Sequence, residues 1–379
     1  MSKTVLFSTS SIKDTNGEIY EGIKDLLLSL VSDGNSVILL SHNIHNANVT
    51  KEQLGDNFDF VVCTTRTKVR EVIRSQHNKE VILVGSRDVD LQLAASKKLL
   101  LIRPMWSSIQ EQKAVIYGLA IKAPIILTKV MKILNNQKAW FYELDVDENT
   151  KVLSLTNANT LGNYSDSELV LANGFRKLLK NGDMEYYYTL LLHFISSVLN
   201  NQEFIKINIW TIMPSSGVEN NQQMWRFKER VRIILGKRQK EPLFIRHTEA
   251  PKSRNIKDLD KRLPCDRHFD TIHINPVYRG KLKGKNICVI DDYLTNGTSF
   301  ETLRNLLLKE GVSKIVFVSL GRYRRTRGIQ YLKQDFRLSG DTFSPNYEYE
   351  LLGSEELTGD YNNEAIDDIR ELYDIIHNE

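Results

Sequence analysis

The residues best suited to chemistry lie in one segment of thirteen, Ile287–Ser299, which reads ICVIDDYLTNGTS. Its four apolar residues predict a buried strand, which ends at two adjacent carboxylates, Asp291 and Asp292. The hydroxyl-rich turn that follows opens a helical pattern, and the free N–H groups at a helix start bind anions such as phosphate. Gly297 lets the backbone close over that anion. Two carboxylates beside a phosphate repel it unless they hold hydroxyl groups or a cation, so a sugar diol and Mg²⁺ are the natural occupants.

This segment resembles the phosphoribosyl-pyrophosphate (PRPP) motif of the type I phosphoribosyltransferases. That motif has four apolar residues, two acids, two variable positions, and then Thr-Thr/Ser-Gly-x-Thr/Ser. Asn296 stands where the family has a hydroxyl residue, although an amide can also donate a hydrogen bond. The resemblance covers roughly residues 200–335 and is nearest to orphan and competence-type members, without a matching base-recognition hood. The alternative interpretation is an acidic strand end followed by an ordinary Asn-Gly turn.

The resemblance implies a role for each part of the segment. Asp291 and Asp292 would bind the ribose 2′- and 3′-hydroxyls and position Mg²⁺. The 5′-phosphate of PRPP would be held by five consecutive residues: Thr295, Asn296, Gly297, Thr298 and Ser299. Mg²⁺ is therefore the expected cofactor and PRPP the expected donor substrate, with the two aspartates as both catalytic and metal-binding residues.

Family order also implies two earlier loops. A strand over Ile207–Met213 runs into a small-residue loop, in which Ser215 and Ser216 would bind pyrophosphate. A basic loop follows, from which Lys252 and Arg254 would close over the departing pyrophosphate as catalytic residues and exclude water. The alternatives are a plain turn for the first loop and a solvated basic loop for the second.

The N-terminal part resembles a haloacid-dehalogenase-type (HAD-like) module in the order of its strand ends, but not in its catalytic residues. The family requires Asp-x-Asp after the first strand, and this chain has Ser8-Thr9-Ser10. The positions that correspond to the family's site are Ser8, Ser10, Ser41 and Asp90. Because serine alone is a weak nucleophile, we expect this site to be degenerate and without catalytic activity. A generic Rossmann-like domain is the alternative.

Apolar strands alternate with helical patterns at both ends of the chain, which predicts an α/β protein. We expect two Rossmann-like parallel-sheet domains joined by a mainly helical connector. The predicted division is a HAD-like or Rossmann-like domain over 1–105, the connector over 106–202, a phosphoribosyltransferase domain over 203–335, and an acidic extension over 336–379 that ends in an amphipathic helix at Glu364–His377. A single long helix is predicted over Ala114–Leu134.

The formal net charge of +4 hides a strong asymmetry. Residues 341–379 carry a local charge of −11, whereas residues 226–285 carry eighteen Lys and Arg against seven Asp and Glu. The basic region suits either a polyanionic small molecule or a nucleic-acid or ribonucleoprotein partner. No apolar stretch is long enough to span a bilayer, so we expect a cytoplasmic protein with no membrane partner. We also expect a homo-oligomer or a subunit of a complex.

These observations predict a Mg²⁺-dependent phosphoribosyltransferase that transfers phosphoribosyl from PRPP to an unidentified base, amine or macromolecule and releases pyrophosphate. Such an enzyme would belong to nucleotide metabolism or to antiviral defence. Two other functions remain open at this point. One is a non-catalytic regulator that binds PRPP or a nucleotide. The other is an effector or toxin of a bacterial defence system such as a retron, which binds nucleic acid or a ribonucleoprotein.

Overall fold

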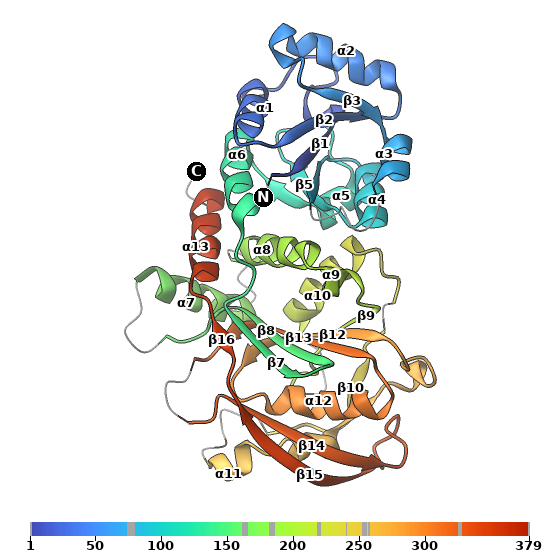
Figure 1. The fold of residues 1–379 in the computed structure, drawn as a ribbon, viewed down its shortest axis with the longest axis vertical. Helices are drawn as coiled ribbons and strands as arrows, with labels where there is room; N and C mark the ends of the chain where they lie inside the picture. Colours follow the sequence, from blue (N-terminus) through green and yellow to red (C-terminus); the bar gives the residue numbers. More distant parts are fainter. Residues whose placement is uncertain are drawn as a thin grey trace.

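The computed structural model describes residues 2–73, 80–160, 166–181, 186–217, 221–239, 241–251, 256, 258–324 and 328–377. Within these residues the chain is α/β, as predicted, and it builds two lobes that each contain a six-stranded sheet (Figure 1). Two smaller antiparallel sheets, β10 (Phe244–Arg246) with β11 (Ile272–Ile274) and β14 (Tyr331–Ser339) with β15 (Glu348–Leu357), belong to the second lobe. The strands of both large sheets are rich in apolar residues, and helices cover these sheets.

The first sheet is parallel throughout, with the strand order β3-β2-β1-β4-β5-β6 in the described residues. Its strands are β1 (Thr4–Ser8), β2 (Ser36–Ser41), β3 (Val62–Thr65), β4 (Val81–Val84), β5 (Leu100–Pro104) and β6 (Leu119–Ile121). The crossovers run through α1 (Ile23–Ser32), α2 (Ile44–Leu54), α3 (Arg66–Val72), α4 (Asp88–Lys97) and α5 (Gln112–Tyr117). This is a doubly wound arrangement, in which polar residues at the carboxyl ends of the strands meet at one edge.

The second sheet is mixed, with the order β16-β7-β8-β13-β12-β9 in the described residues. Strands β8 (Thr150–Asn157), β13 (Lys314–Arg322), β12 (Asn286–Leu294) and β9 (Ile209–Ile212) run parallel to one another. Strands β7 (Tyr142–Asp147) and β16 (Asp360–Tyr361) are antiparallel to their neighbours. The remaining helices are α7 (Asp166–Asn181), α8 (Tyr187–Asn200), α9 (Gln202–Ile205), α10 (Gln222–Ile234), α11 (Leu259–Arg262), α12 (Thr298–Lys309) and α13 (Glu364–His377).

Residues 106–202 do not form a separate connector. Strand β6 completes the first sheet, and β7 and β8 are part of the second. The predicted single helix over Ala114–Leu134 is wrong, because α5 ends before Gly118, β6 follows, and α6 (Pro124–Asn136) begins at a proline. A Cβ at Gly118 would lie 2.7 Å from the carbonyl oxygen of Ala114 and 2.9 Å from the Cβ of Arg103, so the position between α5 and β6 has room only for glycine. Apolar runs of this length suit a buried strand as well as a helix, which explains the error.

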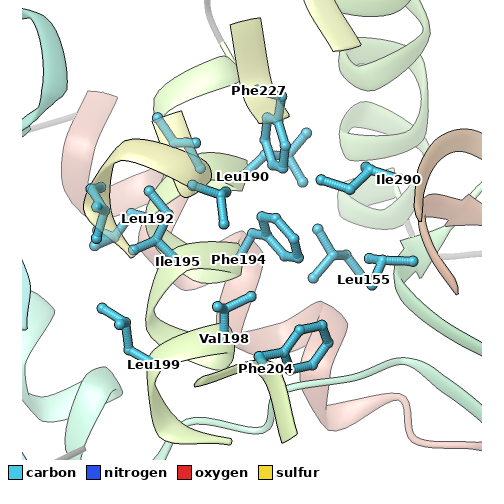
Figure 2. Packing of buried hydrophobic residues seen from close by; sticks show 14 of the residues in the cluster. Leu155, Leu190, Leu192, Phe194, Ile195, Val198, Leu199, Phe204, Phe227 and Ile290 are labelled. Carbon is cyan, nitrogen blue, oxygen red and sulfur yellow. The ribbon is translucent and has the colours of Figure 1, made fainter. Parts of the chain in front are cut away.

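One continuous apolar core joins the two lobes. Helix α8 contacts β5 and β6 of the first sheet, and its buried face packs towards the second (Figures 1 and 2). The ring of Phe194 stacks on Phe227 at 5.0 Å, and both lie close to Leu155 and Ile290 in Figure 2. Both lobes therefore bury part of their apolar surface against the same helix, α8.

The acidic C-terminal segment is built into the fold. Helix α13 matches its predicted bounds, and it packs against α6, α8 and β8. Its acidic residues pair mainly outside the basic region 226–285: Glu364 and Asp368 contact Lys138, and Glu350 pairs with Arg337 in the hairpin of β14 and β15. The exposed pair of Asp341 with Arg279 is a contact to that region. In the part of the chain that is described, no helix has both the length and the apolar character to span a bilayer.

Candidate active site

The carboxyl ends of β9, β12 and β13 surround a cavity of about 800 Å³. The cavity brings together the predicted PRPP segment, from Asp291 to Ser299, and the predicted pyrophosphate loop at Ser215 and Ser216. These two segments are about 75 residues apart in the sequence and meet because β9 and β12 are neighbours, with Ile290 opposite Ile212. The cavity therefore lies where open α/β sheets bind ligands, beyond the carboxyl edge.

The two aspartates lie in the second half of β12, because this strand extends to Leu294 rather than ending at Asp291. Each carboxylate accepts a hydrogen bond from the next backbone N–H through Oδ1, at 2.8 Å for Asp291 and 2.7 Å for Asp292. Burial raises the pKa of both groups, and the neighbouring charge of Asp292 raises that of Asp291 further. The ionised forms of these two adjacent carboxylates are disfavoured. A bound cation, or hydroxyl groups that donate hydrogen bonds to them, would stabilise the ionised forms.

The predicted phosphate loop leads directly into α12. Gly297 is the N-cap residue and has φ of +83°, a left-handed conformation that favours glycine. A Cβ at this position would lie 2.3 Å from the ring of Tyr331, so the loop also needs glycine for space. The first N–H groups of the twelve-residue α12 have no acceptor within the helix, and Thr298 and Ser299 at this end of the helix line the cavity.

The side chain of Asn296 makes a contact that the sequence did not predict. Its amide Nδ2 donates to the carbonyl of Ile329 at 2.5 Å, and the backbone N–H of Leu332 donates to its carbonyl at 3.0 Å. The side chain is buried and ties the phosphate loop to the start of β14. The Asn that replaces the family's hydroxyl residue therefore fixes the loop from behind through one of the two N–H groups of its amide.

Arg322 fixes the same loop from the end of β13. Its buried guanidinium donates to the carbonyls of Thr295 and Gln330, and it stacks on the ring of Tyr142 with 4.7 Å between Cζ and the ring centroid. Sequence analysis missed this residue, because an Arg at a strand end carries no sign of which carbonyl it will reach. Together with Asn296, it holds the phosphate loop in one conformation before any ligand binds.

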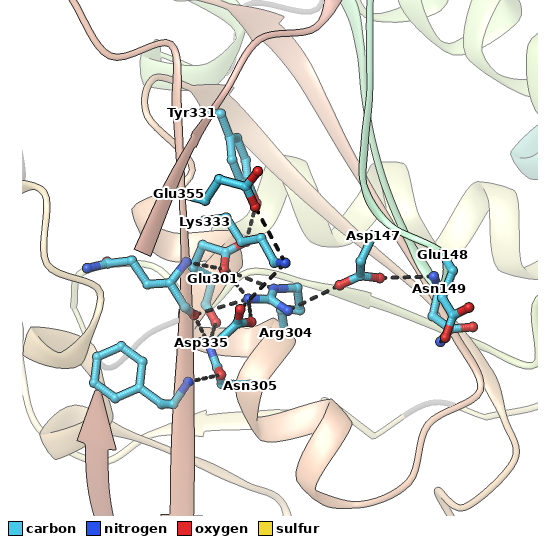
Figure 3. Close-up of polar contacts among 12 residues, drawn as sticks. Asp147, Glu148, Asn149, Glu301, Arg304, Asn305, Tyr331, Lys333, Asp335 and Glu355 are labelled. Atoms are coloured by element: carbon cyan, nitrogen blue, oxygen red, sulfur yellow. Dashed lines mark hydrogen bonds and ion pairs between the residues drawn. The ribbon is translucent and has the colours of Figure 1, made fainter. Parts of the chain in front are cut away.

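An ion-pair network centred on the buried side chains of Arg304 and Glu301 connects α12 to its neighbours (Figure 3). Arg304 contacts Glu301 and Asp335 at 2.6 Å each, and Asp147 of β7 at 3.2 Å. The hydroxyl of Tyr331 donates to Glu301 at 2.6 Å. The network connects α12 to β14 and β7. The ring of Tyr331, which packs on Gly297, is therefore held in place by Glu301 of α12.

The predicted pyrophosphate loop is held by β10. Arg246 Nε donates to the carbonyl of Ser215 at 2.5 Å, and the N–H of Ala250 donates to that of Ser216 at 2.9 Å. Arg246 also donates to the hydroxyl of Thr271, and burial together with the charge of Arg267 lowers its pKa to about 10. A buried cation thus lies beside the loop and faces the cavity.

Arginine dominates the charged residues that line the cavity. Among the described lining residues the only acids are Asp291 and Asp292, whereas the basic ones are Arg176, Arg246, Arg262, Arg267 and Arg324. Sequence analysis singled out none of these five as site residues, although three of them lie in the basic region 226–285. The regional charge count was the available signal, and it could not say which cations share one cavity. A cavity with this balance suits a polyanion.

His268 lines the cavity between these arginines. It is 5% exposed, and neither ring nitrogen has a hydrogen-bond partner among the described residues. Burial and the charges of Arg267 and Arg246 lower its pKa to about 3, so the imidazole is neutral.

Two predicted catalytic residues, Lys252 and Arg254, lie outside the residues that the structure describes.

The predicted N-terminal site is closed by an arginine. Ser8, Ser10, Ser41 and Asp90 are all buried at the carboxyl edge of the first sheet. Arg66 of α3 pairs with Asp90 at 2.6 Å and donates to the Ser8 hydroxyl at 2.9 Å, and that hydroxyl lies 3.2 Å from the one of Ser10. A guanidinium therefore already satisfies the carboxylate that the resemblance assigned to the degenerate site.

The donor set beside the cavity fits magnesium. Mg²⁺ prefers oxygen ligands, retains several waters, and is commonly held by one or two carboxylates together with substrate phosphates. Asp291 and Asp292 supply those carboxylates, and the described residues contain no group of three or more His, Cys, Asp and Glu side chains placed to enclose a metal alone. The residues therefore fit a metal that arrives with a polyphosphate ligand.

The chain matches no protein-family model and no curated protein. The resemblance to the type I phosphoribosyltransferases accordingly depends on the segment Ile287–Ser299 and on what the fold places around it.

Proposed function

We propose that the protein is a Mg²⁺-dependent phosphoribosyltransferase that uses PRPP as its donor. The observation that carries the proposal is the convergence of the paired aspartates, the phosphate loop and the pyrophosphate loop on one arginine-lined cavity. PRPP has a phosphate, a diol and a pyrophosphate, and the cavity offers a suitable group for each. An ordinary acidic strand end would need neither the second loop nor the arginines.

In this proposal the donor lies across the ends of β9 and β12. Thr295–Ser299 and the N-terminus of α12 bind the 5′-phosphate, and Asp291 with Asp292 accept hydrogen bonds from the ribose hydroxyls. Ser215 and Ser216 bind the pyrophosphate, beside Arg246. Mg²⁺, when bound, neutralises part of the pyrophosphate charge and assists its departure.

The reaction transfers the ribosyl C1 from oxygen to a nucleophile. The bond between C1 and the pyrophosphate oxygen breaks with its electron pair on pyrophosphate, a lone pair of the acceptor forms the new bond to C1, and the acceptor's N–H or O–H proton passes to water. Negative charge grows on the pyrophosphate as the bond breaks, so Arg246 and Arg267 are most useful in the transition state. His268 can donate one N–H to the same anion.

The first test is calorimetric titration of PRPP in the presence of Mg²⁺. We expect the double variant Asp291→Asn/Asp292→Asn to bind PRPP at least about a hundredfold more weakly than the wild type, because each lost carboxylate removes charge-assisted contacts. Asp145→Asn is the matched control, since Asp145 is exposed on β7 and pairs only with Lys151 at 3.4 Å among the described contacts. Equal affinities of wild type and double variant would refute the proposal.

Turnover separates an enzyme from a sensor. Release of pyrophosphate from PRPP in the presence of nucleobases, nucleotides or a cell extract identifies a transferase. A protein that binds PRPP through Asp291 and Asp292, yet releases no pyrophosphate with any of these acceptors, is a PRPP-binding regulator instead.

A further inference from the structure

The acceptor end of the cavity differs in chemistry from its donor end. Once the phosphate loop and the pyrophosphate loop are assigned to PRPP, the lining residues without a part of PRPP to bind include two tyrosines and two arginines: Tyr293, Tyr323, Arg176 and Arg324. They come from β12, the end of β13 and α7, three segments that meet beside the ribose-binding aspartates.

The two tyrosines form an aromatic corner. Their ring centroids are 5.4 Å apart at an angle of 41°, and the N–H of Tyr323 donates to the carbonyl of Leu294. Gly321 makes the corner possible, because a Cβ there would lie 3.0 Å from the ring of Tyr293. Both tyrosines are only partly buried, so part of each side chain remains accessible in the cavity. An aromatic surface of this kind favours a planar ligand that stacks on it.

Two cations line the same cavity as the corner: Arg176 of α7, and Arg324, which follows Tyr323 in the chain. Arg324 is held in place by Asn159, which donates to its carbonyl at 3.0 Å and accepts from its N–H at 2.6 Å. Its guanidinium stacks on Tyr361 at 4.7 Å. No acid other than Asp291 and Asp292 lines the cavity within the described residues, so this end is both aromatic and cationic.

The structure assigns, in our view, a nucleotide as the acceptor: its base lies on the Tyr293–Tyr323 corner and its phosphate contacts Arg176 and Arg324. This inference rests on the proposed function. A free neutral base would leave both arginines without an anion, whereas a nucleotide satisfies the rings and the charges together. A cavity of about 800 Å³ is in the upper part of the range of roughly 300–1,000 Å³ for small-molecule sites, so it has room for a donor and a second ligand. A ring nitrogen or amino group of the base would attack C1, with the electron and proton balance given above.

The test is a titration with the four ribonucleoside 5′-monophosphates and the matching uncharged nucleosides, at saturating PRPP and Mg²⁺ so that the donor site is filled. We expect at least one nucleotide to bind about tenfold or more tightly than its nucleoside, or to release pyrophosphate when it reacts. Arg176→Gln should remove that preference for the nucleotide, and Tyr323→Ala should weaken nucleotide and nucleoside alike. Arg337→Gln is the control, because Arg337 is 66% exposed on the distant hairpin.

Three results would overturn the inference: equal binding of nucleotides and nucleosides, no effect of Arg176→Gln, or displacement of the nucleotide by PRPP, which would place it in the donor site. Melting temperatures of the variants close to that of the wild type establish that they fold. The wild-type affinity for PRPP, measured beforehand in a separate titration without nucleotide, separates the two proposals. Failure to bind PRPP refutes the proposed function, whereas normal PRPP binding without a charge preference refutes the nucleotide acceptor alone.

Discussion

At the scale of single residues, the aspartate pair is a source of instability in the unliganded protein. Asp291 and Asp292 are adjacent at the end of a buried strand, and burial together with mutual repulsion raises the pKa of Asp291 well above its usual range. A carboxyl whose pKa is higher in the folded than in the unfolded state stabilises the fold least when it is ionised. Stability is therefore lost as the pH rises through the raised pKa. Sites that bind charged ligands commonly carry this cost.

Asp291→Asn should therefore raise the melting temperature of the ligand-free protein at pH 7.5, because it removes the unfavourable charge. The difference from the wild type should shrink as the pH falls towards 4, where the wild-type carboxyl is also neutral. Scanning calorimetry across this pH range checks the prediction, with Asp145→Asn, on the exposed face of β7, as the control. A lower melting temperature for Asp291→Asn at every pH would contradict it.

At the scale of elements, the phosphate loop is preorganised by contacts behind it. Asn296 donates to the carbonyl of Ile329, Arg322 donates to that of Thr295, and the ring of Tyr331 fills the space beside Gly297. The ion pairs of Arg304 hold α12 and β14 together below the loop. Because these partners are all protein groups, the loop is held without a ligand, which would lower the entropic cost of the proposed phosphate binding.

Gly297→Ala should destabilise the protein and weaken PRPP binding. The left-handed φ of +83° costs about 1 kcal/mol for alanine, and the contact with Tyr331 adds about 1–3 kcal/mol of overpacking. Gly284→Ala is a matched control, since Gly284 has φ of +70° but no atom within 4 Å of an added Cβ. Urea unfolding of both variants isolates the contact. Equal losses of unfolding free energy would show that Tyr331 imposes no steric limit.

At the scale of the whole molecule, the two lobes share their core. Helix α13 packs on α6 below the first sheet and on α8 and β8 beside the second, so the C-terminal segment connects both lobes (Figure 1). The same helix carries acidic residues on its outer face, two of which contact Lys138 in the segment between α6 and β7. Lobes that bury a common apolar cluster are expected to unfold together.

Ile369→Ala should accordingly destabilise both lobes in one step. Ile369 is fully buried in α13, and removing such a side chain costs about 2–5 kcal/mol. Leu352→Ala is the control, because Leu352 is 55% exposed on β15 and its loss should change stability by less than about 0.5 kcal/mol. Calorimetry should give a single transition that moves to lower temperature. Two separate transitions, with only one of them shifted, would show that the lobes are independent.

The sequence alone determined the α/β class and most of the strands and helices, and it singled out Ile287–Ser299 as the predicted anion-binding segment. Those features depend on local periodicity and on residue types at neighbouring positions, which the linear order carries. Helix α13 was predicted to the residue, because its apolar residues recur at helical spacing.

Tertiary structure alone decided which distant residues share the cavity. Arg176, Arg246, Arg267 and Arg324 come from different elements, and only the packing of those elements around the carboxyl ends of β9, β12 and β13 brings them to one cavity. It also decided that Asn296 donates to the carbonyl of Ile329 and that Arg66 forms an ion pair with Asp90. In the same way, the strands within residues 106–202 are divided between the two sheets. The reason is the same in each case: a polar side chain bonds to whatever group the fold brings within reach, and its own sequence neighbours do not specify that group.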